Sequence, residues 1–329
     1  MSNKIYTLGF YNPEVKERYL SRYEGNIQHV ISRIFKISAP LEIQLEKDLY
    51  EFNRDEIKKI LFTADPLTVR ASFQNGINIR NYIDWAIEEA YRSNSINPLA
   101  GLGEKWYEQF VDKGKELILH VDKINEIVDK CENKQDAVII QLIFEGLYGK
   151  NYCELVMLKK NDVDGNVLTL RDNNGKPTRK ITVSDKCIRL IEGALKETEY
   201  VKNNGDISEG TRSKITYLVD TDFVIKKSKT NVKDEGPVTP HVILRRIKTL
   251  QESFDVPYLT VTSIKYSGML YYAKQLYEKD GDLTREHLAM IGAQFGINQI
   301  LVNGKEEYDL RSAKKEFLNV ETIKKIYGI

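Results

Sequence analysis

Apolar residues recur at helical spacing through the first third of the chain. Between residues 53 and 99 this pattern is interrupted at three turn-forming dipeptides, Asp65-Pro66, Asn75-Gly76 and Asn97-Pro98. Asn53 precedes Glu56 by three residues, which is the spacing of a helix-starting capping box. One helix face is apolar and carries Ile79, Tyr82, Ile83 and Ala86. The pattern predicts a small helical domain that ends near residue 115.

The next part of the chain opens with a run, 133–149, in which apolar residues cover a helix nearly all round. Such a helix is expected to be buried. A second helix should begin at about Tyr152. Two short alternating runs then flank Asn174-Gly175, which is the signal of a β-hairpin. The run 215–225 is a candidate third strand.

Helical patterns return after residue 239. Thr239 is placed as an N-cap and Pro240 as the first helical residue, where the missing N–H is tolerated. Three more helical runs follow, at 264–279, 284–295 and 320–329. We therefore expect two domains, residues 1–115 and 116–329, and a mainly α (α+β) fold with one small antiparallel sheet in the second domain.

Composition narrows the classes of function. No apolar run approaches the roughly 20 residues that span a bilayer, and the first 20 residues lack the apolar segment of a signal peptide. These features predict a cytoplasmic protein without a membrane partner. The three cysteines and four histidines are scattered, so we expect no metal and no cofactor. The net charge of +1 neither supports nor excludes DNA binding.

Several strings, together with the order of elements, resemble the tyrosine recombinase (phage integrase) family. "NYIDWAIEEAYRSNSINPL" is similar to the helix of the family's core-binding domain that ends in an Asn-Pro turn. "GKNYCEL" is similar to the opening of the second catalytic-domain helix, and "LTVTSIKYSGML" to the family's His-x-x-Arg box. The resemblance covers most of the chain and implies a helical core-binding domain followed by a helical catalytic-type domain.

The resemblance also assigns the family's catalytic positions. Asn151 stands at the first catalytic arginine, Thr262 at the first position of the second box and Lys265 at its arginine. Lys176 matches the hairpin lysine, while a residue near Ala293 would occupy the later His/Trp box. Tyr308 is the candidate nucleophile, but it lies several residues beyond the usual spacing.

These replacements predict that catalysis is lost. In the family, two arginines hold the scissile phosphate with planar forks that lysine and asparagine cannot reproduce. Loss of one such donor costs on the order of 100 to 1,000-fold in rate. The resemblance then implies a non-enzymatic DNA-binding protein, most similar to the integrase-fold repressors of SPβ-type temperate prophages. We expect a sequence-specific transcriptional repressor that maintains lysogeny, is associated with the host nucleoid, and has double-stranded DNA operators and a phage-encoded regulator as partners.

Two alternatives remain open at this point. The chain could be an active or accessory site-specific recombinase, with Arg245, Arg246 or Arg311 reaching the phosphate. It could also be an interaction protein that has lost DNA binding, although the basic segment 226–248, with seven Lys or Arg against two acids, argues against this.

DNA contacts are expected from that basic segment and from residues beside it. The full predicted set is Lys176, Arg179, Lys226, Lys227, Lys229, Lys233, Arg245, Arg246, Lys248 and Lys265. For any single lysine, a solvated loop or helix face is the alternative.

Two local motifs add further hypotheses. "IGAQFGINQILV" loosely resembles a helix-turn-helix, with Gly292 as the small residue, Gly296 at the turn and Val302 inside the next helix; an ordinary αα-corner is the alternative. Asn151 and Glu154 have the N-x-x-E spacing of a capping box, so we interpret Asn151 as a helix cap rather than a phosphate ligand.

Overall fold

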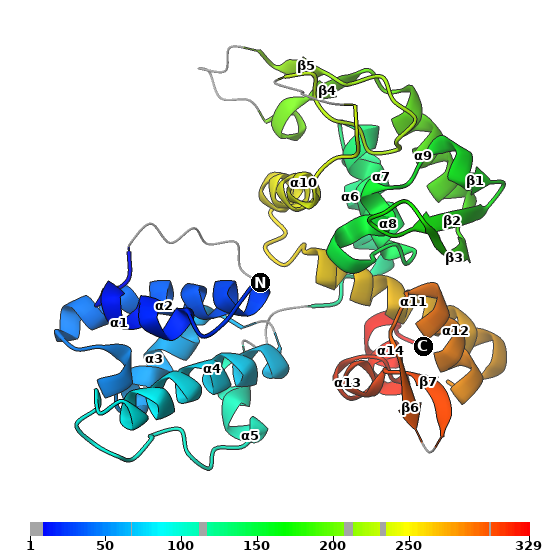
Figure 1. Ribbon diagram of the computed structural model, residues 1–329. Helices are drawn as coiled ribbons and strands as arrows, with labels where there is room; N and C mark the ends of the chain where they lie inside the picture. Colours follow the sequence, from blue (N-terminus) through cyan, green and yellow to red (C-terminus); the bar gives the residue numbers. More distant parts are fainter. Residues whose placement is uncertain (1–8, 67, 112–116, 207–212, 231–234, 303) are drawn as a thin grey trace. The chain divides into compact units, whose positions relative to one another are not determined.

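The computed structural model describes residues 9–66, 68–111, 117–206, 213–230, 235–302 and 304–329 (Figure 1). The chain divides into two compact units, residues 1–115 and 116–329. The boundary that we predicted near residue 115 lies outside the described residues. No helix in these ranges is both long and apolar enough to cross a membrane.

The first unit is helical in its described residues, as predicted. Its elements are α1 (Pro13–Leu20), α2 (Asn26–Leu45), η1 (Leu49–Glu51), α3 (Arg54–Ala64), α4 (Val69–Glu88), α5 (Glu104–Tyr107) and η2 (Glu108–Phe110). The capping box at the start of α3 is confirmed, because Asn53 Oδ1 accepts from the Glu56 N–H and Glu56 Oε2 accepts from the Asn53 N–H. The predicted apolar face of α4 is buried and lies in the core of this unit.

The interruption predicted at Asn75-Gly76 is wrong, because both residues lie inside α4 and are buried. The reason is a close contact with Tyr107. A Cβ atom on Gly76 would lie 2.0 Å from the Tyr107 ring. Glycine here makes room for an aromatic ring and does not mark a turn.

A buried ionic cluster joins α1, α2 and the segment before α3. Lys16 is fully buried, and its Nζ lies 2.5 Å from Glu42 Oε1 and 3.3 Å from Asp48 Oδ2. Tyr82 donates a 2.9 Å hydrogen bond to the other Asp48 oxygen. Burial raises the pKa of Glu42 to about 7, although Lys16 opposes the rise. Two carboxylates therefore share one ammonium group inside this unit.

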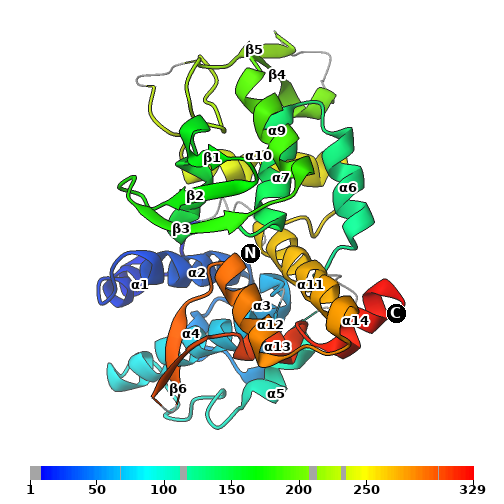
Figure 2. The same ribbon diagram turned by 90° about the vertical axis from the view of Figure 1, so that its right-hand side faces the viewer.

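The second unit is built around α7 (Lys134–Phe144), in which every residue from Gln135 to Phe144 is buried, as predicted. It packs against α6 (Val121–Lys130), α9 (Asp185–Lys196), α10 (Pro240–Ser253) and α11 (Val261–Asp280) (Figure 2). The helix expected from about Tyr152 is present but short: the 3₁₀ turn η3 (Lys150–Tyr152) leads into α8 (Cys153–Val156). The remaining helical elements are η4 (Lys160–Asp162), η5 (Lys202–Gly205), α12 (Arg285–Gln294), α13 (Arg311–Glu316) and α14 (Val320–Tyr327).

The predicted hairpin is confirmed as β2 (Val167–Arg171) and β3 (Pro177–Thr182), with the short β1 (Val163–Asp164) antiparallel to β2. Gly175 in the connecting turn has a φ of 78°, which suits glycine. The predicted third strand exists, but as β5 (Ile215–Tyr217) it pairs with β4 (Glu199–Val201) in a separate sheet. The described part of this unit therefore has three small antiparallel sheets and not one, within a mainly α fold of the predicted class.

The helix-turn-helix hypothesis is wrong. Val302 ends the strand β6 (Gln299–Val302), which pairs antiparallel with β7 (Lys305–Tyr308). Gly292 faces a ring and not a second helix, since a Cβ there would lie 2.3 Å from Tyr308 Cγ. The chain leaves α12 through Gly296, at a φ of 57°, and enters a hairpin.

Helices α7 and α11 approach each other closely. A Cβ atom on Gly268 would lie 1.8 Å from the Phe144 carbonyl oxygen. Backbone is thus in contact with backbone at this crossing, which only glycine permits.

Candidate nucleic-acid interface

The junction between α7 and α8 carries Asn151, the residue that the resemblance assigns to the first catalytic arginine. Gly146 and Gly149 have φ values of 113° and 67°, and Asn151 and Tyr152 are also left-handed, at 55° and 59°. Asn151 is exposed, and its side chain caps neither η3 nor α8. The capping hypothesis for Asn151 is therefore wrong. Asparagine fits this position because it tolerates the left-handed conformation better than most residues.

The Glu154 carboxylate contacts Tyr148 and Arg179 rather than Asn151. Its Oε2 accepts a 2.8 Å hydrogen bond from the Tyr148 N–H. Both of its oxygens accept 2.7 Å hydrogen bonds from Arg179 on β3. The carboxylate thus has other donors, and the left-handed Asn151 does not have the extended backbone typical of an N-cap, so the expected N-x-x-E box does not form.

Arg179 binds more than this one carboxylate. Its Nη1 donates to the carbonyls of Ala293 (3.0 Å) and Gln294 (2.8 Å) at the end of α12. Its Nη2 also donates to the Gly146 carbonyl at 2.8 Å. One guanidinium thus joins β3, the α7–α8 junction, α8 and α12, and its donors are turned toward the protein.

Lys265, the residue that the resemblance assigns to the second arginine, has a different environment. It lies on α11 with Nζ 4.5 Å from the centre of the Tyr148 ring. Burial lowers its pKa to about 8, with a further decrease from Arg179 that Glu154 opposes. Within the described ranges, no hydrogen-bond or ion-pair partner accompanies this ammonium group. Thr262, one turn earlier on α11, is half-buried.

Tyr308 is half-buried at the end of β7, and its side chain packs against Gly292 of α12. It borders the small apolar core that α11, α12 and α14 share. The candidate nucleophile is thus part of the packing of the C-terminal hairpin.

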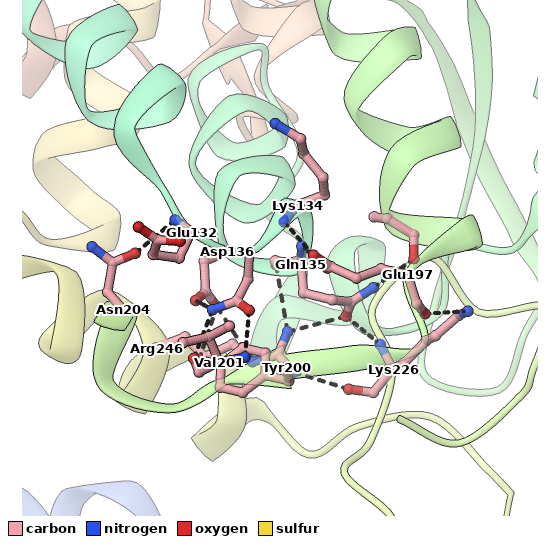
Figure 3. A network of polar contacts seen from close by, with 12 residues as sticks. Glu132, Lys134, Gln135, Asp136, Glu197, Tyr200, Val201, Asn204, Lys226 and Arg246 are labelled. Carbon is pink, nitrogen blue, oxygen red and sulfur yellow. Dashed lines mark hydrogen bonds and ion pairs between the residues drawn. The ribbon is translucent and has the colours of Figure 1, made fainter. Parts of the chain in front are cut away.

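Two predicted DNA contacts lie inside the second unit (Figure 3). Lys226 is 2% exposed, and its Nζ donates to the carbonyls of Leu195 (2.6 Å) and Glu197 (3.1 Å). Arg246 is 4% exposed and contacts Asp136, Gln135 and the Lys226 carbonyl. These cations have internal partners, which corrects their placement as surface phosphate contacts.

The surrounding network orders the N-terminus of α7. Glu197 accepts the Lys134 and Gln135 N–H groups at 2.9 and 2.7 Å. Arg246 lies over the Tyr200 ring, 4.9 Å from its centre. Burial raises the pKa values of Asp136 and Glu197 and lowers that of Lys226. The network joins α7, the end of α9, β4 and α10 (Figure 3).

The remaining predicted contacts are more accessible. Lys176, Lys229 and Arg245 are exposed, and Lys227 and Lys248 are half-buried. Lys248 also forms a 3.5 Å ion pair with Glu252. Lys233 lies outside the described residues. Sequence reasoning did not select two further exposed cations, Lys150 in η3 and Lys180 on β3. Lys150 has no basic neighbour in the sequence, whereas Lys180 directly follows the predicted Arg179 and was overlooked.

The order of elements agrees with the predicted resemblance: a helical unit, then a buried helix, an antiparallel hairpin and further helices up to Tyr308. This is a protein of the tyrosine recombinase fold class. More specifically, the chain belongs to the MrpR family. The family model described as "MrpR, C-terminal catalytic domain" matches residues 118–328, and "MrpR, N-terminal core-binding domain" matches residues 10–88.

The individual proteins to which the chain is similar share 29% or less of its sequence in the three comparisons described next. The chain is 29% identical over 324 residues, covering 97% of both chains, to the SPbeta prophage-derived uncharacterized protein YopR of Bacillus subtilis strain 168. A lambda integrase dimer bound to a COC′ core site gives a TM-score of 0.49 at 12% identity, covering 88% of this chain and 92% of that one. The Tn1549 transposon integrase in complex with circular intermediate DNA gives 0.45 at 15% identity, covering 92% and 97%.

Proposed function

We propose that this protein is a sequence-specific DNA-binding repressor of a temperate phage that uses a recombinase fold without cutting DNA. The observation that carries the proposal is the state of the two arginine positions. Asn151 is a short, exposed, left-handed residue, and Lys265 is a single ammonium group. Neither can form the planar fork that holds a phosphoryl group in transfer.

Three arginines of the described residues have other partners and do not replace them. The guanidinium of Arg179 is occupied by Glu154 and three carbonyls. Arg246 is occupied by the buried network, and Arg311 forms an ion pair with Asp309 at the surface. Of the three arginines named in the recombinase alternative, Arg246 and Arg311 are thus discounted, and that alternative now depends on Arg245, which is exposed.

DNA contact is assigned to the accessible cations. Lys176, Lys229 and Arg245 are exposed and are the primary candidates, with Lys227 and Lys248 beside them. Lys265 is a further candidate phosphate ligand, because its ammonium group has no acceptor among the described residues. Lys226, Arg179 and Arg246 act instead by holding the elements that carry these contacts.

The biological setting follows from the relative. A prophage-derived protein that matches over nearly the whole chain supports a phage origin. A repressor of this kind would bind operator sites in the cytoplasm of the bacterial host, on the nucleoid, and would maintain lysogeny. A phage-encoded regulator that releases it is a second proposed partner.

The test combines a binding assay with a trapping assay. In a gel shift on the surrounding phage DNA, the protein should bind particular duplex sites at least about 1,000-fold more tightly than random DNA. On a nicked suicide substrate that contains the bound site, it should form no covalent adduct. An adduct that disappears in Tyr308→Phe would establish the recombinase alternative, and equal affinity for all sequences would contradict the repressor.

A further inference from the structure

A cavity of about 530 Å³ lies within the second unit, apart from the proposed DNA contacts. It is bordered by α6, α7, α11 and the end of α12. Four aromatic side chains line it: Phe144, Tyr271, Tyr272 and Phe295. Two polar side chains at the end of α7, Gln141 and Glu145, line it as well. The cavity thus combines apolar rings with hydrogen-bond acceptors.

The Glu145 carboxylate is held in place by three donors. Its Oε1 accepts from Gln141 Nε2 and Ser184 Oγ, and its Oε2 accepts from the Ser184 N–H, each at 2.6 Å. A carboxylate offers about four acceptor positions. One position on Glu145 therefore remains for another donor.

Gln141 provides the second acceptor. It is 5% exposed, and its amide nitrogen is committed to Glu145. Its Oε1 is buried and has no hydrogen-bond partner among the described residues. A buried acceptor without a donor is unfavourable, and a group that supplies an N–H would relieve the cost.

The charge of the lining selects the kind of donor. Glu145 is the lining carboxylate, while the lining cation Lys186 is paired with Asp129 at 2.8 Å and donates to Asn125 at 2.9 Å. The cavity therefore favours a positive group. Aromatic faces favour a planar cation in particular, since it stacks on the rings while its edge donates hydrogen bonds.

We propose that this cavity is a binding site for an amidinium or guanidinium group on an apolar body. Its N–H groups bind Gln141 Oε1 and the Glu145 carboxylate, and its plane packs against the Tyr271 and Tyr272 rings. The group can belong to a small molecule or to an arginine side chain of a peptide.

Calorimetric titration of the full-length protein tests the site with matched probes. Benzamidine should bind, its neutral isostere benzamide should bind at least about tenfold more weakly, and benzoate should not bind. Titration with N-acetyl-arginine methylamide separates the two sources: binding tighter than benzamidine identifies a peptide side chain, and weaker binding a small aromatic cation. No binding of benzamidine, or equal binding of all three benzene derivatives, would overturn the proposal.

Variants locate the site. Gln141→Met preserves the shape of the side chain and removes the unpaired oxygen together with the Nε2 donor to Glu145. Benzamidine affinity should fall about tenfold, and the melting temperature, measured alongside, reports the loss of that internal hydrogen bond. Glu145→Gln removes the charge and should weaken benzamidine more than benzamide; it serves as the second variant if Gln141→Met does not fold. Gln74→Met, on an exposed face of α4, is the control and should change nothing. Unchanged benzamidine affinity in both cavity variants would place the binding elsewhere. The titrations contain no DNA, so their outcome is independent of the proposed repressor function.

Discussion

Glu154 and Arg179 form a bidentate ion pair, with both hydrogen bonds at 2.7 Å, between two segments separated by 25 residues in the sequence. The side chains are 7% and 19% exposed, so the pair is largely shielded from water. Removal of one member of a buried pair leaves the other charge without a partner.

We therefore expect Glu154→Gln and Arg179→Lys each to lower the free energy of unfolding by about 3 kcal/mol. Lysine keeps the charge of Arg179 but cannot reach the carboxylate and three carbonyls together. Urea unfolding followed by circular dichroism measures the effect. The neighbouring exposed residue provides the control, since Lys180→Ala should change stability by less than about 0.5 kcal/mol. An Arg179→Lys variant as stable as the wild type would contradict a structural role for this guanidinium.

Substitutions in the basic segment should fall into two groups, those that lower stability and those that weaken DNA binding. Lys226→Met and Arg246→Met should lower the melting temperature, because the first leaves the buried carbonyls of Leu195 and Glu197 without this donor and the second removes the cation paired with buried Asp136. Lys229→Ala and Arg245→Ala should leave the melting temperature unchanged, weaken DNA binding and reduce the salt slope by about one per lost phosphate contact. Thermal denaturation and salt-dependent fluorescence anisotropy distinguish the groups. If Lys229→Ala and Arg245→Ala both keep the wild-type slope, the accessible surface assigned to DNA is not the one used.

Lys265 should give DNA binding a pH dependence that surface lysines do not. Its pKa is lowered to about 8, so the ammonium is charged at pH 7 and mostly neutral at pH 9. If it binds phosphate, affinity should fall across this interval, because the charged form is lost. Anisotropy titrations at the two pH values test this, and Lys265→Gln should bind more weakly at pH 7 and show a flatter profile. A profile that is identical in the variant would remove Lys265 from the interface.

Glu42 should make the first unit less stable as pH rises toward neutrality. Its folded pKa is raised to about 7, above the value of about 4.5 in an unfolded chain. Between these values the folded state binds a proton that the unfolded state lacks, so the free energy of unfolding falls as pH increases. The loss should be on the order of 2 kcal/mol. Urea unfolding at pH 5 and pH 7.5 measures it, with Glu42→Gln expected to abolish most of the difference; stability that rises over this range in the wild type alone would contradict the shift.

Substitutions of Asn151 should change the stability of the protein through the left-handed backbone conformation and not through loss of a helix cap. Its φ of 55° is costly for alanine and free of cost for glycine. Asn151→Ala should therefore destabilise by about 1 kcal/mol, whereas Asn151→Gly should be as stable as the wild type or more stable. Chemical denaturation of the three proteins decides this. A glycine variant less stable than the alanine variant would show that the asparagine side chain makes a stabilising contact.

The sequence correctly predicted the helix starts and the turn that are determined by residues next to one another in the chain. The Asn53–Glu56 box, Pro240 at a helix start and the Asn174-Gly175 turn all depend on neighbouring residues, and each appears as expected. The dipeptide Asn75-Gly76 was misread because the same glycine that favours a turn also admits a ring from 31 residues away. Likewise, nothing within the segment 292–302 shows that Tyr308 will return to pack on Gly292.

The candidate site was less predictable because the environment of a lysine or arginine side chain depends on residues that are far away in the sequence. Arg179 meets Ala293 across 114 positions, and Arg246 meets Gln135 across 111. The sequence of a basic cluster does not show whether its side chains face solvent or donate to buried carbonyl groups. The sequence therefore identified the basic segment, but it could not separate the exposed cations, which we propose contact DNA, from the buried cations, which bind groups inside the protein.

The crossing at Gly268 also bears on the position of Lys265. The backbone of α11 lies against that of α7 with no side chain between them, so any side chain at residue 268 would push the two helices apart. Lys265 lies less than one turn from Gly268, and Tyr148 follows the end of α7 by only a few residues. The close approach of the two helices therefore helps to set the 4.5 Å separation between the Lys265 ammonium and the Tyr148 ring. A larger residue at position 268 would change the surroundings of Lys265 without altering that lysine itself.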